Sequence, residues 1–424
     1  MQIHHLSICA FAAVLLIGSA GPVRGEAHFG VLPDTVTAED ARNAWERFKR
    51  QGLTSANTPG PNMLRQFWRD DTRGEYQAWA LILAVMHDDH EVARKLWNFC
   101  KHYIPDQRDG LVPWLIPRNP HAPRGMNVAD ADFDYAIALD MAARKWPDYV
   151  DDEGKTWADW AQYYINRIYD TQRARAVNPE SPNAISGKGF DRSRQAYAGG
   201  ADEHYYLHYS PYGYFRNWQD RTGNRNWTEA VDGLESVYEA EIKLQRPTLA
   251  KYYGEASENP HCWPPHQVRK DGSPADDMTA RYDSGWNMFN WGPGRITARA
   301  NHAYTNYGDA HAEKMLRYLA DRFLAETEGD PAEIRTGYRM GHERGAGCQG
   351  WGEPNLWHVG HAAMAAMVDE QYRDMLDRMS EALKEADTEG DPHENLAQAY
   401  YLLHLSGGMD FRISDGQPDG PASD

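Results

Sequence analysis

The chain has 424 residues, with 44 basic against 62 acidic side chains and a formal net charge of −18. A surface this acidic repels phosphate backbones and anionic lipids, so neither a nucleic-acid partner nor a membrane partner is expected. The 15 Trp and 24 Tyr residues outnumber the 11 Phe residues. Such rings pair a flat apolar face with a polar edge, as stacking on a sugar ring requires. A core that simply favours Trp explains the same composition equally well.

The amino terminus has the layout of a secretory signal. The apolar run Leu6–Ile17 precedes the small residues Gly18–Ala20, and it is shorter than the ~20 apolar residues that a spanning helix needs. We therefore expect residues 1–25 to be a signal peptide and the protein to be secreted or periplasmic. Residues 26–424 contain no linker long or polar enough to divide them, so they are expected to form a single domain.

The remaining chain reads as a series of helices. Thr37-Ala-Glu-Asp40 is a capping box that opens a first helix running to Arg50, before Gly52. In the later stretches Ala, Leu, Met and Trp recur at i, i+3 and i+4, and β alternation is scarce. The later predicted helices are Glu75–His87, Glu91–Tyr103, Asp130–Lys145, Lys155–Ile168, Pro211–Arg221, Trp227–Leu244, Trp286–Tyr304, Ala310–Ala325, Leu356–Val368, Glu370–Ala386 and Glu394–Leu405.

About twelve consecutive helices in one domain favour an all-α fold, an (α/α)6 barrel made of six helical hairpins. Inner and outer helices alternate in such a ring, so all inner helices start at the same end. The even-numbered stretches start with carboxylates and aromatic residues, namely Glu75, Asp130, Asp132, Tyr209, Tyr212, Tyr282, Asp283, Trp357, His358, His393 and Glu394. N-capping explains any one of these acids, but it does not explain the aromatic residues beside them.

One of these starts lies in a recognisable motif. The segment Thr72–Val85 resembles a motif of glycoside hydrolase family 8 that reads Ser-Glu-Gly-x-Gly-Tyr-Gly-Met-Leu-Leu-Ala-Val. The resemblance implies that Glu75 is the catalytic general acid and that Trp79, which stands at a family Tyr, binds substrate. Gly74 replaces the Ser and Tyr76 replaces a Gly, so the sugar site beside the acid is expected to differ in shape.

The segment Val128–Leu139 is similar to the same family's Ala-Thr-Asp-Ala-Asp-x-Asp-Ile-Ala-x-Ala-Leu. By resemblance, Asp130 would hold the distorted sugar at the cleavage point and Asp132 would support it. The alternating Asp residues also suggest an EF-hand calcium loop. That loop needs Gly at its sixth position and Glu at its twelfth, where this chain has Tyr135 and Met141, so calcium is excluded.

A third segment, Arg281–Trp286, resembles the family's Tyr-Asp-Ala-x-Arg. The resemblance implies that Asp283 is the general base that activates water and that Tyr282 is its partner. The Arg that follows the Asp in the family is missing here. The nearest candidate for its role is Arg295, which we expect to bind substrate.

Weaker similarities extend the resemblance over nearly the whole mature chain, in order. Trp114 lies where the family has a Trp before its Asp motif, which implies a stacking platform for sugar. Tyr209 precedes a helix ending in Arg221–Asn224, as in the family's Asn-Pro-Ser-Tyr-Phe segment, which implies a further substrate contact. Residues Tyr400–Gly407 match a common family ending.

The resemblance implies an exported, monomeric, endo-acting β-1,4-glycanase that needs no cofactor or metal and cleaves a polysaccharide with inversion. Cellulose or another β-glucan, xylan and chitosan remain open as the substrate. Two other functions also remain open. A polysaccharide lyase on a similar toroid would release unsaturated products, and a catalytically inactive carbohydrate-binding protein would bind without releasing reducing sugar.

Metal and disulfide chemistry have weak support in the sequence. His261, Cys262, His266 and Cys348 could surround a metal ion, but their spacing fits no standard zinc pattern. Cys9 leaves with the signal peptide, so the mature chain has an odd number of cysteines and at most one internal disulfide. If a bridge forms, Cys262–Cys348 is the expected pair, since both residues fall in long predicted loops.

Overall fold

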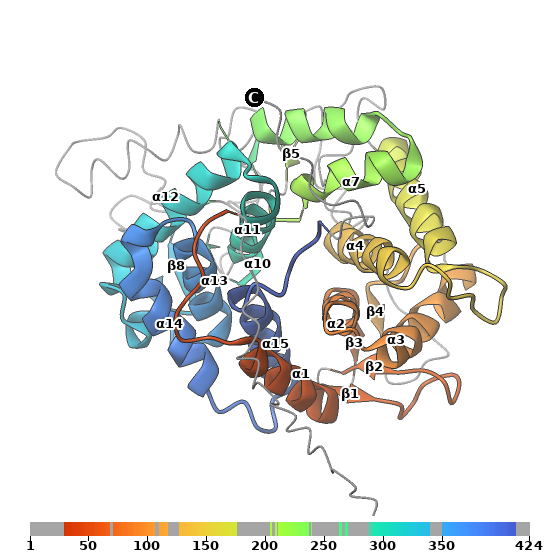
Figure 1. Ribbon diagram of the computed structural model, residues 1–424, viewed down its shortest axis with the longest axis horizontal. Helices are drawn as coiled ribbons and strands as arrows, with labels where there is room; N and C mark the ends of the chain where they lie inside the picture. The colour runs from red at the N-terminus through yellow and green to blue at the C-terminus, as the bar shows by residue number, and fades with distance from the viewer. Residues whose placement is uncertain are drawn as a thin grey trace, which may run out of the picture.

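The computed structural model shows an all-α (α/α)6 barrel (Figure 1). It describes residues 29–67, 71–106, 110–117, 127–175, 204–205, 208–209, 211–236, 239, 263–264, 268–269, 288–289, 291–339 and 350–412. The expected signal peptide, residues 1–25, lies outside these ranges, as do Cys262 and Cys348. No helix within them combines the length and the apolar character needed to cross a bilayer.

The inner wall of the barrel is a closed ring of helices. Its members are α2 (Gly74–Met86), α4 (Ala129–Lys145), α7 (Tyr212–Thr222), α11 (Ile296–Tyr307), α13 (Leu356–Ala366) and α15 (Pro392–Leu405). They pack in this order, and α15 closes the ring against α2. Between α4 and α7 the Phe133 and Phe215 rings lie 5.5 Å apart. These helices correspond to the even-numbered predicted stretches, so the expected alternation is confirmed.

The outer layer consists of the helices that alternate with the inner ones along the chain. They are α1 (Ala38–Gly52), α3 (His90–Tyr103), α5 (Trp157–Arg175), the helical residues 226–236, α12 (Ala310–Thr327) and α14 (Arg373–Glu385). Outer helices such as α1 bury one apolar stripe, whereas every residue of α2 from Gly74 to Val85 is buried. The predicted capping box closes α1, because Thr37 and Asp40 bond each other's backbone N–H.

Short elements complete the connections between the helices. The strands are β1 (Leu53–Thr54), β2 (Arg65–Gln66), β3 (Thr72–Arg73), β4 (Leu115–Ile116), β5 (His204–Tyr205), β6 (Val268–Arg269), β7 (Met288–Phe289), β8 (Gly337–Arg339) and β9 (Gly350–Trp351). They form the antiparallel pairs β1–β2, β3–β4 and β5–β6 and the three-stranded β7–β8–β9. The short helices are η1 (Ile104–Asp106), α10 (Trp291–Gly294), η3 (Pro331–Glu333) and η4 (Glu370–Tyr372).

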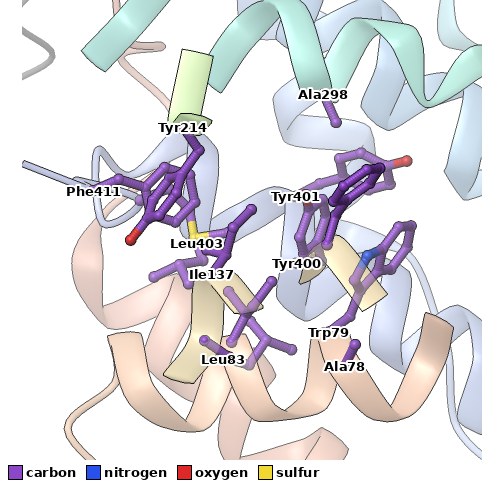
Figure 2. Close-up of a cluster of buried hydrophobic side chains, with 14 of the residues drawn as sticks. Ala78, Trp79, Leu83, Ile137, Tyr214, Ala298, Tyr400, Tyr401, Leu403 and Phe411 are labelled. Carbon is purple, nitrogen blue, oxygen red and sulfur yellow. The ribbon is translucent and has the colours of Figure 1, made fainter. Parts of the chain in front are cut away.

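Large side chains from the inner helices fill the centre of the barrel (Figure 2). Trp79 of α2 stacks on Tyr400 of α15, with ring centroids 4.6 Å apart and planes inclined by 11°. Elsewhere in the same cluster, Tyr214 of α7 meets Phe411 edge-on at 5.2 Å. At this level the barrel is therefore a close-packed core and not an open channel.

A buried ion pair crosses this core between α4 and α11, two helices that α7 separates in the ring. The Asp134 carboxylate accepts hydrogen bonds from Nη1 and Nη2 of Arg299, with Nη2 at 2.9 Å from Oδ2. Both side chains are almost completely buried. The Trp79 indole N–H also donates to Asp134 Oδ2, at 2.7 Å. One carboxylate thus ties together three inner helices.

The predicted helix Trp286–Tyr304 is wrong in its first part. Residues 288–289 form strand β7, the one-turn helix α10 follows, and the inner helix α11 begins only at Ile296. The physical reason is the sequence Gly292-Pro293-Gly294, since Pro lacks a donor and Gly is a poor helix former. The inner helix α11 therefore begins later than expected, and Asp283 lies outside the described residues. The predicted helix Glu370–Ala386 is likewise divided into η4 and α14.

Replacing Arg299 by Met should destabilise the fold strongly. Met keeps much of the side-chain volume but leaves the buried Asp134 carboxylate without its charge partner, a loss of about 3–5 kcal/mol in unfolding free energy. The matched control is Lys95→Met, which removes an exposed ion pair with Glu91 that solvent screens. Urea unfolding followed by circular dichroism measures both variants, and equal losses would contradict the role given to the buried pair.

Candidate active site

Glu75 lies in the first turn of α2, where a glycine lets two inner helices approach closely. A Cβ atom on Gly74 would lie 3.1 Å from the Cβ of Ala131 in α4 and 3.5 Å from the Trp114 carbonyl oxygen. The Gly74 N–H donates to that same carbonyl at 2.7 Å. The start of α2 is therefore held against both α4 and the segment that carries Trp114.

The Glu75 carboxyl is buried, and only one of its two oxygens has a hydrogen-bond partner among the described residues. The Trp114 indole N–H donates to Glu75 Oε1 at 2.9 Å. Among the residues that the structure describes, no group hydrogen bonds Oε2. Burial, together with the nearby Asp130 carboxylate, raises the pKa of Glu75 to about 7 against the opposing effects of Arg295 and Trp114. A carboxyl with this pKa still carries a proton in a large fraction of molecules at neutral pH.

Asp130, Arg295 and Tyr209 lie together beside Glu75. The Arg295 guanidinium pairs with Asp130 Oδ2, and both side chains are almost completely buried. Its central carbon lies 5.2 Å from the centroid of the Tyr209 ring. Asp130 Oδ1 has no hydrogen-bond partner among the described residues. Glu75 therefore shares its buried site with a second carboxyl that is paired with a cation.

Asp132 is buried on the same turn of α4 and is fully occupied by protein donors. The Tyr164 hydroxyl of α5 donates to its Oδ1 at 3.0 Å, and the Asn127 amide donates to its Oδ2 at 2.6 Å. These bonds anchor the start of α4. They favour a supporting role for Asp132, with Asp130 as the carboxylate that faces the acid.

Trp79, the other predicted substrate contact on α2, has a different environment. Its side chain is 2% exposed, its N–H is bonded to Asp134, and its ring stacks on Tyr400. Figure 2 shows it among the core side chains. In this arrangement both the ring and its polar edge are used inside the barrel, which favours a packing role over contact with a sugar.

Tyr282 and Asp283 lie outside the described residues, so the structure does not place the expected general base. It does place Arg295, which pairs with Asp130. The role expected for Arg295, replacement of the family's Arg near the base, stays a prediction, and the structure adds the contact between Arg295 and Asp130.

Sequence reasoning missed the second charged layer, Asp134 with Arg299. The signal was present, because Asp130 and Asp134 are one helical turn apart, as are Arg295 and Arg299. Two acids and two arginines at the same spacing on different buried helices predict a ladder of two ion pairs. Matching them requires knowing which inner helices face each other, and that knowledge comes only from the fold.

One group of carboxylates elsewhere has the proximity of a metal site. Asp151, Asp152 and Glu153 bring ligand oxygens within 4.8 Å of one another. The Lys101 ammonium already lies 2.9, 2.7 and 3.1 Å from their oxygens. Because this cation compensates their charge, the cluster is a salt-bridge network that joins α3 to the loop before α5.

Replacing Asp130 by Asn should lower the pKa of Glu75. The substitution removes a neighbouring negative charge and leaves the Arg295 cation without its partner, and both changes favour the ionised form of Glu75. Carbon-13 NMR of glutamate-labelled protein follows the titration, and Glu75→Gln assigns the signal. A pKa that stays the same or rises would show that Asp130 is not the carboxylate coupled to the acid.

Part of the chain is similar to known sequences. Residues 31–186 match the family model described as glycosyl hydrolases family 8. An endoglucanase from Cellulomonas uda is 30% identical over 112 residues, which cover 26% of this chain and 30% of that protein. The chain therefore matches less than a third of the length of this curated relative.

Solved structures extend the similarity to the whole barrel. An apo β-1,3-1,4-glucanase from Paenibacillus sp. X4 is 16% identical with a TM-score of 0.71, covering 92% of this chain and 99% of that chain. A GH8 xylobiose complex from Teredinibacter turnerae is 16% identical with a TM-score of 0.66, covering 89% and 96%. A reducing-end-xylose releasing exo-oligoxylanase is 16% identical with a TM-score of 0.62, covering 88% and 93%.

At these identities the structural likeness concerns the fold, whereas the family match covers the segments that contain Glu75 and Asp130. Both agree with the motifs read from the sequence, and residues 31–186 of this chain are thus similar to glycoside hydrolase family 8.

Proposed function

We propose that the protein is an exported, monomeric glycoside hydrolase that cleaves a β-1,4-linked polysaccharide within the chain and inverts the anomeric centre. The observation that carries this proposal is the pair of unlike carboxyls at the start of α2 and α4. Glu75 has a pKa raised to about 7 mainly by burial, while Asp130 is paired with Arg295. Glycosidic bond cleavage usually needs one carboxyl that can donate a proton and a second carboxyl close to the scissile bond.

The proposed mechanism gives each residue one task. Glu75 donates its proton to the glycosidic oxygen as the leaving group departs. Asp130, steadied by Arg295, holds the sugar at the cleavage point in a distorted shape. Asp283 removes a proton from the water that attacks the anomeric carbon from the opposite face. Its role rests on the resemblance of Arg281–Trp286 to the family motif.

The substrate class is proposed from the relatives. Their names refer to an endoglucanase, a β-1,3-1,4-glucanase, a xylobiose complex and an exo-oligoxylanase. Cellulose or another β-glucan and xylan are therefore the polymers to test, together with chitosan, which the family resemblance leaves open. Product-length analysis separates internal from terminal cleavage. Release of products that absorb in the ultraviolet would instead identify a lyase, and binding without release of reducing sugar would identify an inactive binding protein.

Glu75→Gln should reduce turnover by about 10²–10⁴-fold, because the amide cannot supply the proton and general acid catalysis contributes a factor of that size. The variant should keep the fold and bind the polymer, since Gln nearly matches Glu in volume. Circular dichroism and affinity electrophoresis check both points. Retention of more than about a tenth of the wild-type activity would remove Glu75 from the role of acid.

The stereochemistry of the first product tests the roles of water and base. An inverting enzyme fits a water between base and sugar and holds its carboxyls ~6.5–9.5 Å apart, whereas a retaining enzyme holds them at ~5–5.5 Å. Proton NMR before mutarotation should show the α anomer first from a β-linked substrate. Asp283→Asn should be nearly inactive, and Asp130→Asn should lose turnover more than affinity. Prompt release of the β anomer would rule out Asp283 as the base.

A further inference from the structure

A two-stranded ribbon fixes Trp114 next to the proposed acid. Strand β3 pairs with β4 in the register Thr72 with Ile116 and Arg73 with Leu115. Because β3 runs directly into α2 and Trp114 directly precedes β4, this pairing places the indole beside Glu75. The Gly74 N–H to the Trp114 carbonyl extends the ribbon by one more bond. The relative position of Trp114 and Glu75 is thus set by backbone hydrogen bonds.

The side chain of Trp114 is held as firmly as its backbone. The Arg73 guanidinium carbon lies 5.4 Å from the centroid of its ring, a distance at which a cation is attracted to the aromatic face. On its polar edge the indole N–H donates to Glu75 Oε1 at 2.9 Å. The indole is therefore held at its face by Arg73 and at its N–H by Glu75. The bond to the N–H in turn orients the Glu75 carboxyl.

The chemistry of this bond distinguishes the two carboxyl oxygens. An indole nitrogen can only donate a hydrogen bond, so Oε1 must present a lone pair to it. In the protonated carboxyl the hydrogen then lies on Oε2, the oxygen that no described group bonds. The indole thus keeps the proton off Oε1 and on Oε2.

We propose that Trp114 is a positioning residue for the general acid, which selects the oxygen of Glu75 that carries the proton and stabilises the carboxylate left after proton transfer. This inference rests on the proposed function and goes beyond the stacking role expected from the sequence. After Glu75 gives its proton to the glycosidic oxygen, the same indole bond is strengthened by the new negative charge. The bond is therefore stronger after transfer than before it, as a catalytic contribution requires.

Trp114→Phe separates the two roles of the side chain, because Phe keeps an aromatic face but has no N–H. The KM should change little. At about pH 5 the kcat should fall by about tenfold or more, since the acid is no longer oriented. The loss of a bond to the ionised form should move the alkaline midpoint of the pH–rate profile upward by about one pH unit. Trp114→Ala should also raise KM, since the face is lost.

Trp160→Phe is a matched control elsewhere in the fold. The Trp160 indole donates to Asp151 Oδ2 at 2.8 Å, and the Lys155 ammonium lies 3.8 Å from its ring centroid. The same substitution therefore removes the same kind of bond from an indole that is also covered by a cation. Its kcat, KM and pH profile should equal those of the wild type.

Titration of the Glu75 carboxyl by carbon-13 NMR makes the inference independent of any substrate. Its pKa should be higher in Trp114→Phe than in the wild type and unchanged in Trp160→Phe. An unchanged Glu75 pKa in Trp114→Phe, or kinetics equal to those of the control, would overturn the positioning role. Absence of hydrolysis by the wild type on every polymer, with the shifted pKa intact, would reject the proposed function and leave the Trp114–Glu75 interaction established.

Discussion

The structure depends on two buried ion pairs that connect α4 to α11 across the barrel. Asp130 pairs with Arg295, and one helical turn away Asp134 pairs with Arg299. Taking four charges out of water is costly, and the cost is offset only when each charge has its partner in good geometry. Because the two pairs repeat at the same spacing, a shift of either helix would break both. The ladder therefore fixes the register of α4 relative to α11, and Trp79 joins α2 to it.

The two layers of this ladder have different consequences. In the Asp134–Arg299 pair, the Asp134 carboxylate accepts hydrogen bonds from Arg299 and from the Trp79 indole. Its charge therefore stabilises the contact between helices. In the Asp130–Arg295 pair, Asp130 Oδ1 accepts no hydrogen bond from the described residues, and the carboxylate lies close enough to Glu75 to raise its pKa. The Arg295 cation acts on Glu75 in the opposite direction and lowers its pKa. The charged residues that hold α4 and α11 together therefore also influence the pKa of Glu75.

The sequence was sufficient to predict the ring of alternating helices, because inner stretches such as α2 are apolar all round and outer ones such as α14 carry a single apolar stripe. It failed where local composition competes with periodicity, at Gly292-Pro293-Gly294 before α11. It also placed Glu75, Asp130 and Arg295 among the candidates without showing that Arg295 pairs with Asp130. That pairing joins residues far apart in the chain, and periodicity within one helix contains no information about which buried helices face each other.

The aromatic side chains beside Glu75 distinguish this site from the family motif. Tyr76 stands where the resemblance has a Gly, and its hydroxyl is 2.9 Å from His393 Nε2. The Trp357 indole donates to His393 Nδ1 at 3.1 Å, so Nδ1 must accept, and Nε2 carries the hydrogen that bonds Tyr76. Burial lowers the pKa of His393 to about 4, so this neutral arrangement persists near neutral pH. The rings of Tyr76, His393 and Trp357 thus occupy the α15 side of the acid, where a Gly at position 76 would leave space. The sugar site of this chain therefore differs in shape from one that has the Gly, and the side chains of this chain determine which sugar it accepts.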